Sequence, residues 1–349
     1  MRGSRPVLVA AASVMVLLSV AMAPAAVAGP DRSVCGGIIA YNEIPVGAGP
    51  GSSRLMAVPA TGGTPRVVWD RPGAVQGELD PAWSADGRSI AFAGRSTDAS
   101  GLLDSRLYVL RPGMAEPQEL VIQLGQRGGL RFPTWSPDGT RLAYATGVPP
   151  QGADYKGLAW VHIVDVRTGQ DTLLTGVPGA LVTPDLDWSP RGDQILISAL
   201  DPNNGHWTIF SARPDPTDPK LSVLISDDAG ARASTGYPAF LPGGHAVLVE
   251  QDETDYLSSR LYLSDPRFQH LVPVTPRPGW ETEPDFGASP LQAVYQQYND
   301  DRSQTAISVV TLLTGQSRTL VPPVTGVYVE QPDWQPALGC RPWPFPSVN

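Results

Sequence analysis

Short stretches of alternating apolar and polar residues run through the chain from about residue 36 onward, and glycine or proline bounds most of them. A period of two is typical of β-strands whose two faces have different surroundings. Clear examples are the stretches 53–59, 106–111, 159–166 and 260–265. The same part of the chain shows no helical period of 3.6 residues, so the pattern predicts an all-β protein.

One phrase of this pattern recurs along the chain. The sequence Pro-Thr-Trp-Ser-Pro-Asp-Gly at 133–139 has a near-copy at 81–87, and alignment on the aromatic residue finds six copies spaced 52, 53, 52, 46 and 48 residues apart. Proline stands two residues before the aromatic in five copies, and Leu186 takes its place in the sixth. We call the six aromatic residues the anchors: Trp83, Trp135, Trp188, Phe240, Phe286 and Trp334.

Each unit of about 50 residues contains four short strands. A strand that ends at the anchor is followed by a turn rich in glycine and proline, an apolar strand, an alternating strand and a last short strand. Repeats of this length and content indicate β-propeller blades, which bury their faces only against one another. The sequence therefore predicts an all-β, six-bladed β-propeller with the anchors packed between blades.

The two ends of the repeat region complement each other. Stretches 36–43, 53–59 and 64–70 match the second, third and fourth strands of a blade, whereas the last copy, near 330–340, supplies only a first strand. We predict a velcro closure in which N- and C-terminal strands share one blade. Cys35 and Cys340, the only cysteines, fall in the turn between the first two strands of that blade. A disulfide between them is the prediction, and two buried free thiols are the alternative.

The N-terminus has the pattern of an export signal. Arg2 and Arg5 precede an apolar run over 7–22, and small residues stand at Ala26–Ala28. A membrane anchor is the rival interpretation, but the run is short for a span of about 20 residues. We predict a signal peptide over 1–28 and one propeller domain over 29–349, without a membrane span. The predicted location is extracellular or in the cell envelope, which means the periplasm in a Gram-negative cell.

The charge of the mature chain limits its partners. Without the first 28 residues it has 23 lysines and arginines against 34 acidic residues, a net charge of −11. Such a protein repels phosphate backbones and anionic membrane surfaces. We therefore predict a protein that binds neither nucleic acid nor an anionic membrane and that has a protein or peptide partner, with a cationic partner as the narrower hypothesis. We predict a monomer.

The pattern Pro-x-Trp-Ser-Pro-Asp-Gly, completed by Leu142-Ala143-Tyr144, resembles the WD40-like repeat of TolB-like propellers. Similar repeats occur in the propeller domains of prolyl oligopeptidases and dipeptidyl peptidases. The resemblance covers most of the chain from Cys35 to Cys340, although the copies at Phe240, Phe286 and Trp334 are degenerate. It implies the fold and a role in binding proteins or peptides, or in controlling access to a catalytic domain.

Signals for chemistry are weak. The sequence has no G-x-S-x-G elbow, no H-x-x-x-H pair and no cysteine–histidine cluster. We predict a secreted scaffold without enzymatic activity and without a cofactor. Two alternatives remain open: a carbohydrate-active hydrolase or lyase, which needs two carboxylates across a cleft, and a structural protein of the cell envelope.

Acidic residues gather where the central channel should open. Three residues before the anchors stand Asp80, Asp185 and Glu283. Glu78, Glu281 and Glu330 are expected to lie close to the same rim. Carboxylates that converge on one opening favour a cation, so the hypothesis is a basic group of a ligand, or Ca²⁺, bound by those three residues. In the alternative, they turn into the gaps between blades and pair with Arg131 or Arg232.

Overall fold

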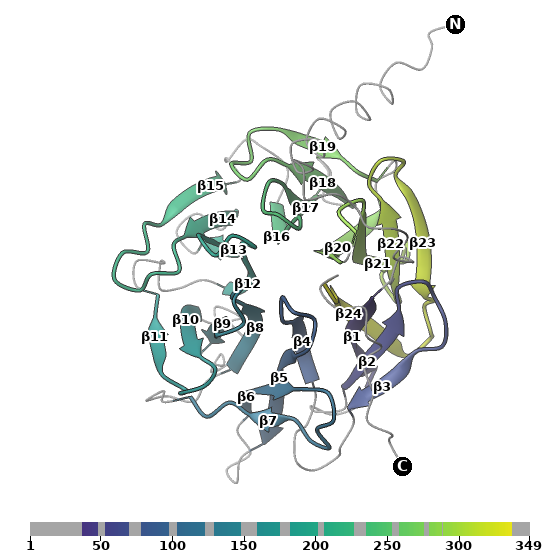
Figure 1. Ribbon diagram of the computed structural model, residues 1–349. Coiled ribbons are helices and arrows are strands. Elements are labelled where there is room, and N and C mark those ends of the chain that lie inside the picture. Colours follow the sequence, from purple (N-terminus) through teal and green to yellow (C-terminus); the bar gives the residue numbers. More distant parts are fainter. Residues whose placement is uncertain are drawn as a thin grey trace, which may run out of the picture.

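Six four-stranded antiparallel sheets surround a central axis in the computed structural model (Figure 1). The structure describes residues 37–47, 53–69, 78–97, 103–122, 129–147, 159–174, 182–201, 206–226, 235–252, 258–275, 279–287 and 289–336. These residues form 24 strands and no helix. The predicted all-β propeller with six blades is therefore confirmed. The predicted signal peptide over 1–28, Cys35 and Cys340 lie outside the described residues.

Within each blade the strands follow one another from the channel outward. Blade 1 contains β24 (Val327–Trp334), β1 (Ile38–Pro45), β2 (Arg54–Pro59) and β3 (Arg66–Trp69). Blade 2 contains β4 (Glu78–Trp83), β5 (Ile90–Thr97), β6 (Leu103–Leu110) and β7 (Gln118–Glu119). Blade 3 contains β8 (Gly129–Trp135), β9 (Arg141–Gly147), β10 (Ala159–Asp165) and β11 (Asp171–Leu173).

The other three blades have the same order. Blade 4 contains β12 (Val182–Trp188), β13 (Ile195–Asp201), β14 (His206–Ala212) and β15 (Ser222–Ser226). Blade 5 contains β16 (Thr235–Phe240), β17 (Val247–Asp252), β18 (Ser259–Ser264) and β19 (Leu271–Pro273). Blade 6 contains β20 (Trp280–Phe286), β21 (Gln292–Tyr298), β22 (Thr305–Thr311) and β23 (Gln316–Val321).

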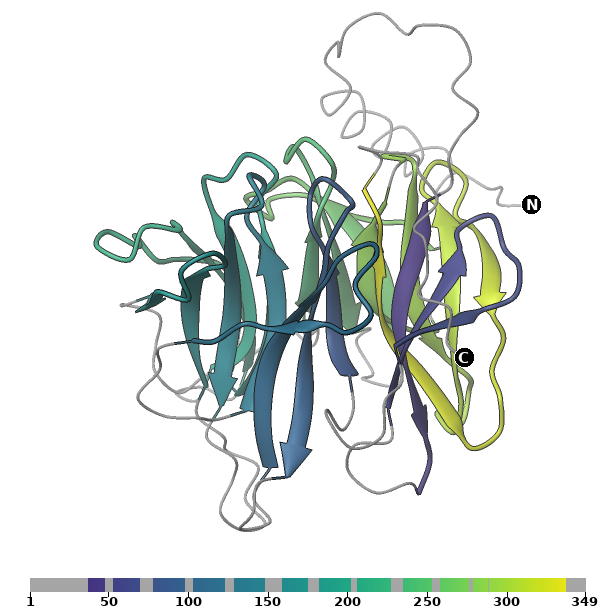
Figure 2. The same ribbon diagram turned by 60° about the horizontal axis from the view of Figure 1, so that its bottom comes forward.

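Blade 1 joins the two ends of the described chain. Strand β24 pairs antiparallel with β1, from Ile39 opposite Trp334 to Pro45 opposite Val327. The Gln335 N–H then donates to the Ile38 carbonyl at 2.9 Å. Figure 2 shows β24 and β1 side by side, both running between the two faces of the ring. The first and the last strand thus close the ring by backbone hydrogen bonds.

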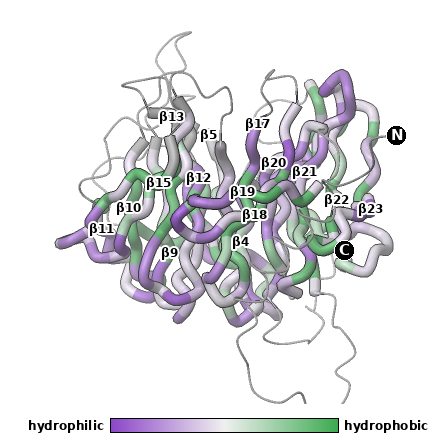
Figure 3. Tube along the Cα trace, turned by 90° about the horizontal axis from the view of Figure 1, so that it is seen from above, coloured by the Kyte–Doolittle hydropathy of each residue, from purple (hydrophilic) through white to green (hydrophobic). Residues whose placement is uncertain are grey.

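The hydrophobic core lies between the blades, because each sheet has apolar residues on both faces. Six clusters of buried side chains each draw on two neighbouring blades; one combines Leu55 of blade 1 with Trp83 and Phe92 of blade 2. All six anchors are buried, as predicted. Figure 3 shows hydrophobic stretches along strands such as β10, whereas the turns are mostly hydrophilic.

Glycine at 287 is required where the last blade meets the first. A Cβ placed there would lie 2.1 Å from the Trp334 ring, which packs against this backbone. We expect Gly287→Ala to lower the free energy of unfolding by about 1–3 kcal/mol, because the buried indole cannot move away without strain. Denaturant unfolding of the purified protein measures the change.

The matched control is Gly279→Ala in the same blade. A Cβ at Gly279 would be no closer than 3.7 Å to its nearest neighbour, the Glu281 side chain. We expect this substitution to change the free energy of unfolding by less than about 1 kcal/mol. Equal losses from the two variants would show that the Trp334 contact does not determine the choice of glycine.

Candidate functional site

A cavity of about 560 Å³ occupies the centre of the ring and is lined by residues of all six innermost strands. The residue three positions before each anchor lines it in every blade, and we call these six residues the mouth ring. In order from blade 1 to blade 6 they are Gln331, Asp80, Phe132, Asp185, Tyr237 and Glu283. From blade 2 to blade 6, carboxylates and aromatic rings therefore alternate around the opening.

The backbone at the mouth ring departs from regular strand geometry. Five of its six residues have a positive φ between 47° and 55°, and Asp185, which precedes leucine instead of proline, is the exception. Each innermost strand has a register shift near this position. A proline has no N–H to lose from the ladder, so it is tolerated at such a bulge. Repeated strain of this kind is typical of functional sites.

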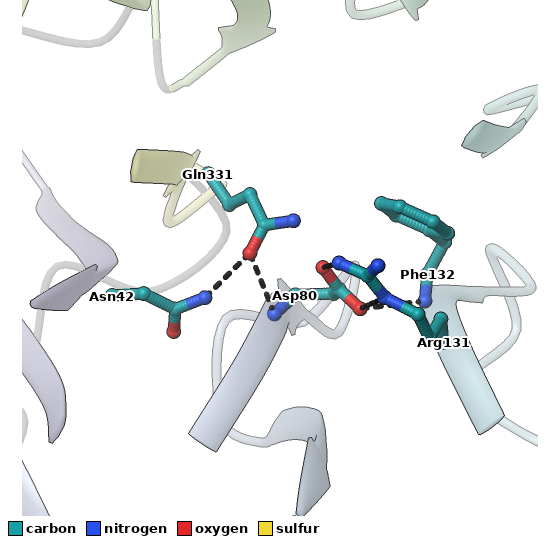
Figure 4. Close-up of polar contacts among 5 residues, drawn as sticks. All are labelled: Asn42, Asp80, Arg131, Phe132 and Gln331. Atoms are coloured by element: carbon teal, nitrogen blue, oxygen red, sulfur yellow. Dashed lines mark hydrogen bonds and ion pairs between the residues drawn. The ribbon is translucent and has the colours of Figure 1, made fainter. Parts of the chain in front are cut away.

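The bulge frees backbone N–H groups to bond across the blades (Figure 4). Glu283 Oε2 accepts the N–H of Gln331 at 2.8 Å, and Gln331 Oε1 accepts the N–H of Asp80 at 3.1 Å. Asp80 Oδ2 in turn accepts the N–H of Phe132 at 3.1 Å. Asn42 Nδ2 also donates to Gln331 Oε1, at 2.5 Å. A continuous chain of hydrogen bonds thus links blades 6, 1, 2 and 3 at the mouth.

A second set of side chains repeats this arrangement deeper in the channel. We call the residues directly before the anchors the inner ring: Ala82, Thr134, Asp187, Ala239, Asp285 and Asp333. Its three aspartates each accept the N–H of the next blade's anchor, at 2.6 to 2.9 Å, namely that of Phe240, Trp334 and Trp83 respectively. Thr134 Oγ1 accepts the Trp188 N–H at 3.2 Å. The inner ring therefore fixes four of the six anchors against the preceding blade.

Burial and mutual repulsion disfavour the charged form of these carboxylates. Burial, with the charges of Asp80 and Asp285, raises the pKa of Asp185 to about 7. Burial likewise raises the pKa of Asp285 to about 7. The pKa of Glu283 is well above its ordinary value because of burial and then the charge of Glu330. Like charges held in one channel are costly unless a proton or a cation neutralises them.

Arg131 supplies positive charge on one side of the mouth. Its Nε lies 3.4 Å from Asp80 Oδ2, and its guanidinium covers the Phe132 ring at 4.6 Å (Figure 4). For Asp80 the structure therefore agrees with the alternative hypothesis, pairing with Arg131 between blades. Asp80, Asp185 and Glu283 all line the cavity, and ligand binding by the three residues stays a prediction. Arg232 and the Glu78 side chain lie outside the described part.

The expected position of Glu281 was wrong. This carboxylate faces blade 5, where Oε2 accepts hydrogen bonds from Thr275 Oγ1 and from the Leu261 N–H. The Glu281 backbone and the Ser259 hydroxyl exchange two further bonds. Strand alternation explains the difference, since Glu281 precedes the bulge and points between the blades rather than into the channel.

Sequence reasoning missed the inner ring. Its signal was present as an aspartate directly before the anchor in three copies, at 187, 285 and 333. Two further acidic residues, Asp300 and Asp301, are exposed in the β21–β22 turn.

Two kinds of site are absent from the described residues. No three His, Cys, Asp or Glu side chains there are arranged to hold a metal ion, so Ca²⁺ binding stays a prediction. The same part of the chain contains no helix long and apolar enough to cross a bilayer. His162 is buried and pairs through Nδ1 with Asp171 Oδ2 at 2.8 Å.

Comparison with known proteins identifies the fold. No protein-family model matches the sequence, and a comparison with curated proteins finds no relative. Among solved structures, TolB from Acinetobacter baumannii matches with a TM-score of 0.65 and 17% identity, over 86% of this chain and 67% of that one. The chain has the fold of the TolB propeller.

Other structures with this TolB-like fold differ in their chemistry. A putative TolB from Agrobacterium tumefaciens matches with a TM-score of 0.58 and 16% identity, over 84% of this chain and 98% of that one. An oligogalacturonate lyase in complex with manganese matches with a TM-score of 0.54 and 12% identity, over 77% and 70%. At such identities the likeness establishes the TolB-like propeller and leaves function to the site itself.

Proposed function

We propose that the protein is an exported propeller scaffold, without enzymatic activity, which binds a protein or peptide at the mouth of its channel. The observation that supports the proposal is the mouth ring: Asp185, Tyr237 and Glu283 line one cavity together, and Glu283 and Tyr237 sit on strained backbone. An acidic opening of this kind attracts basic ligands and suits a cationic surface on the partner.

The hydrogen bonds of the channel carboxylates also favour binding over catalysis. Glu283, Asp187, Asp285 and Asp333 each accept a backbone N–H from the next blade. A carboxylate tied to the scaffold in this way holds the ring together, whereas a general acid or base must be free to exchange a proton with substrate. The site is therefore best suited to recognition.

Position-specific cross-linking tests the proposal. A photo-activated amino acid in place of Arg302, exposed in the β21–β22 turn at the channel mouth, should capture a partner protein from culture supernatant or cell envelope. The control places the same group at Thr168, which is exposed in the β10–β11 turn and does not line the cavity. Capture at Arg302 but not at Thr168 supports binding at the mouth.

Two outcomes would contradict the proposal. Equal capture at both positions, or at neither, would remove the mouth as a binding surface and leave the structural envelope protein as the better reading. Cleavage of an oligosaccharide by the purified protein, lost in a Glu283→Gln variant, would instead establish the carbohydrate-active alternative. The lyase of similar fold makes oligogalacturonate the first substrate to assay.

A further inference from the structure

The mouth ring contains one niche that the chain fills with its own guanidinium. Asp80 of blade 2 and Phe132 of blade 3 flank the Arg131 side chain, which contacts the carboxylate at 3.4 Å and the ring at 4.6 Å. Arg131 reaches this place because it directly precedes Phe132 on β8. A carboxylate and an aromatic face together are a favourable setting for a guanidinium.

The same combination recurs two blades further on. Asp185 of blade 4 and Tyr237 of blade 5 occupy the positions of Asp80 and Phe132, and both line the cavity. The charges of Glu283, Glu250 and Asp185, after burial, raise the Tyr237 pKa, so these groups lie close enough to interact. The Trp207 ring lies 6.3 Å from that of Tyr237 and supports it from the side.

The residue that would supply a guanidinium is different in this second niche. Gly236 stands directly before Tyr237, where Arg131 stands before Phe132. Among the described residues no salt bridge to Asp185 or Glu283 occurs, and Asp185 lacks the bond to the next blade that Asp80 makes to Phe132. The second niche therefore has a carboxylate and an aromatic ring, as the first has, but no arginine at the position of Arg131.

We propose that Asp185, Tyr237 and Glu283 bind the guanidinium of an arginine side chain that a partner inserts into the channel mouth. An organic cation fits better than a metal ion, because no metal-binding cluster occurs in the described part and an aromatic ring separates the two carboxylates around the opening. This inference rests on the proposed function for its partner, but it can be tested on the isolated protein.

The test uses N-acetyl-arginine amide as the probe and its neutral isostere, N-acetyl-citrulline amide, as the comparison, in calorimetric or NMR titrations. We expect the arginine probe to bind at least about tenfold more tightly than citrulline, since charge-assisted hydrogen bonds and a cation–π contact are lost in the isostere. Asp185→Asn and Glu283→Gln should each weaken arginine binding about tenfold. Asp300→Asn, which removes the same charge from the β21–β22 turn at this face, should change it less than twofold.

A variant that adds an arginine side chain to the second niche gives the most direct test. Gly236→Arg should place a guanidinium in the second niche as Arg131 does in the first, and so abolish binding of the arginine probe. Its Cβ would meet only Ser198 Oγ at 3.5 Å, an ordinary contact, and Gly236 does not need a positive φ. Should this variant not fold, the two isosteric variants decide the question alone.

The outcomes separate this inference from the proposed function. Equal binding of arginine and citrulline, unchanged binding in Asp185→Asn and Glu283→Gln, or binding of Ca²⁺ but not of arginine overturns the inference. If excess arginine probe, added before irradiation, does not reduce the cross-linking of a partner at Arg302, the inference is also overturned, whereas the proposed binding function stands. Arginine binding without any captured partner supports the inference and contradicts the proposed function.

Discussion

Asparagine in place of Asp187, Asp285 and Asp333 is expected to make the protein more stable at pH 8. In the folded state burial raises the pKa of Asp285 from 3.8 to about 7. Burial, followed by the charge of Asp285, raises the pKa of Asp333 well above its ordinary value. Burial, followed by the charges of Asp285 and Asp185, does the same to the pKa of Asp187. Asparagine keeps an oxygen for the anchor N–H without the buried charge, so it avoids this cost.

The expected pH dependence follows from the direction of the shifts. When the pKa of a carboxyl group is higher in the folded state, there is a pH range between the two pKa values. In that range the folded protein keeps the proton and the unfolded chain has lost it. The group's contribution to stability is complete below about pH 4 and is lost as the pH rises through the folded value near 7. For Asp285 the difference corresponds to about 4 kcal/mol at most, because one pKa unit is about 1.4 kcal/mol.

Unfolding in denaturant at pH 4 and pH 8 measures the effect, with alanine variants as the matched control. Ala82 and Ala239 occupy the same ring in other blades, so alanine fits there. Alanine leaves an anchor N–H without its acceptor. We therefore expect the free energy of unfolding to fall by about 1–3 kcal/mol at both pH values. If the asparagine variant is instead less stable than the parent at pH 8, a cation bound by the folded protein neutralises the inner ring.

Reduction of the protein is expected to lower its stability by up to about 5 kcal/mol. The prediction concerns Cys35 and Cys340, which would close a loop of about 300 residues. Three residues after Cys35 and five before Cys340, the Ile38 carbonyl accepts the Gln335 N–H, so the flanking strands meet. A bridge there would restrict the unfolded chain and hold β24 on β1.

Thermal unfolding with and without a thiol reductant measures this contribution. The control is the double variant Cys35→Ser, Cys340→Ser, which should unfold at a lower temperature and show no response to reductant. A peptide map without reduction should recover the two cysteines in one linked peptide pair. Alkylation of both thiols in the unreduced native or unfolded protein would contradict the prediction.

Most of the fold could be predicted because its signals are local and repeated. Alternation gives the strands, and an anchor such as Trp135 recurs in register because every blade needs the same large side chain against its neighbour. Outer strands were less predictable. The stretch 118–123 has strand-like composition, yet β7 covers only Gln118 and Glu119, because an outermost strand has a partner on one side only.

The site was only partly predictable. The sequence places Asp80, Asp185 and Glu283 near one opening, but the direction of each side chain depends on a bulge that no local pattern specifies. Asp80 therefore bonds to blade 3, whereas Asp185, which precedes Leu186, does not follow the backbone geometry of the others. Pairing of Asp80 with Arg131 is a contact between different blades, so it appears only when the ring is assembled.

The closure of blade 1 also determines which face of the propeller carries both ends of the described chain. Strand β24 runs away from the channel mouth toward Trp334, and β1 begins opposite that residue. The described chain therefore enters and leaves the ring at neighbouring points on the face opposite the mouth ring. A domain fused directly at residue 37 or residue 336 would extend from this face and leave the face of the β21–β22 turn uncovered. A surface to which such a fusion is attached would present the same face of every propeller to the solution.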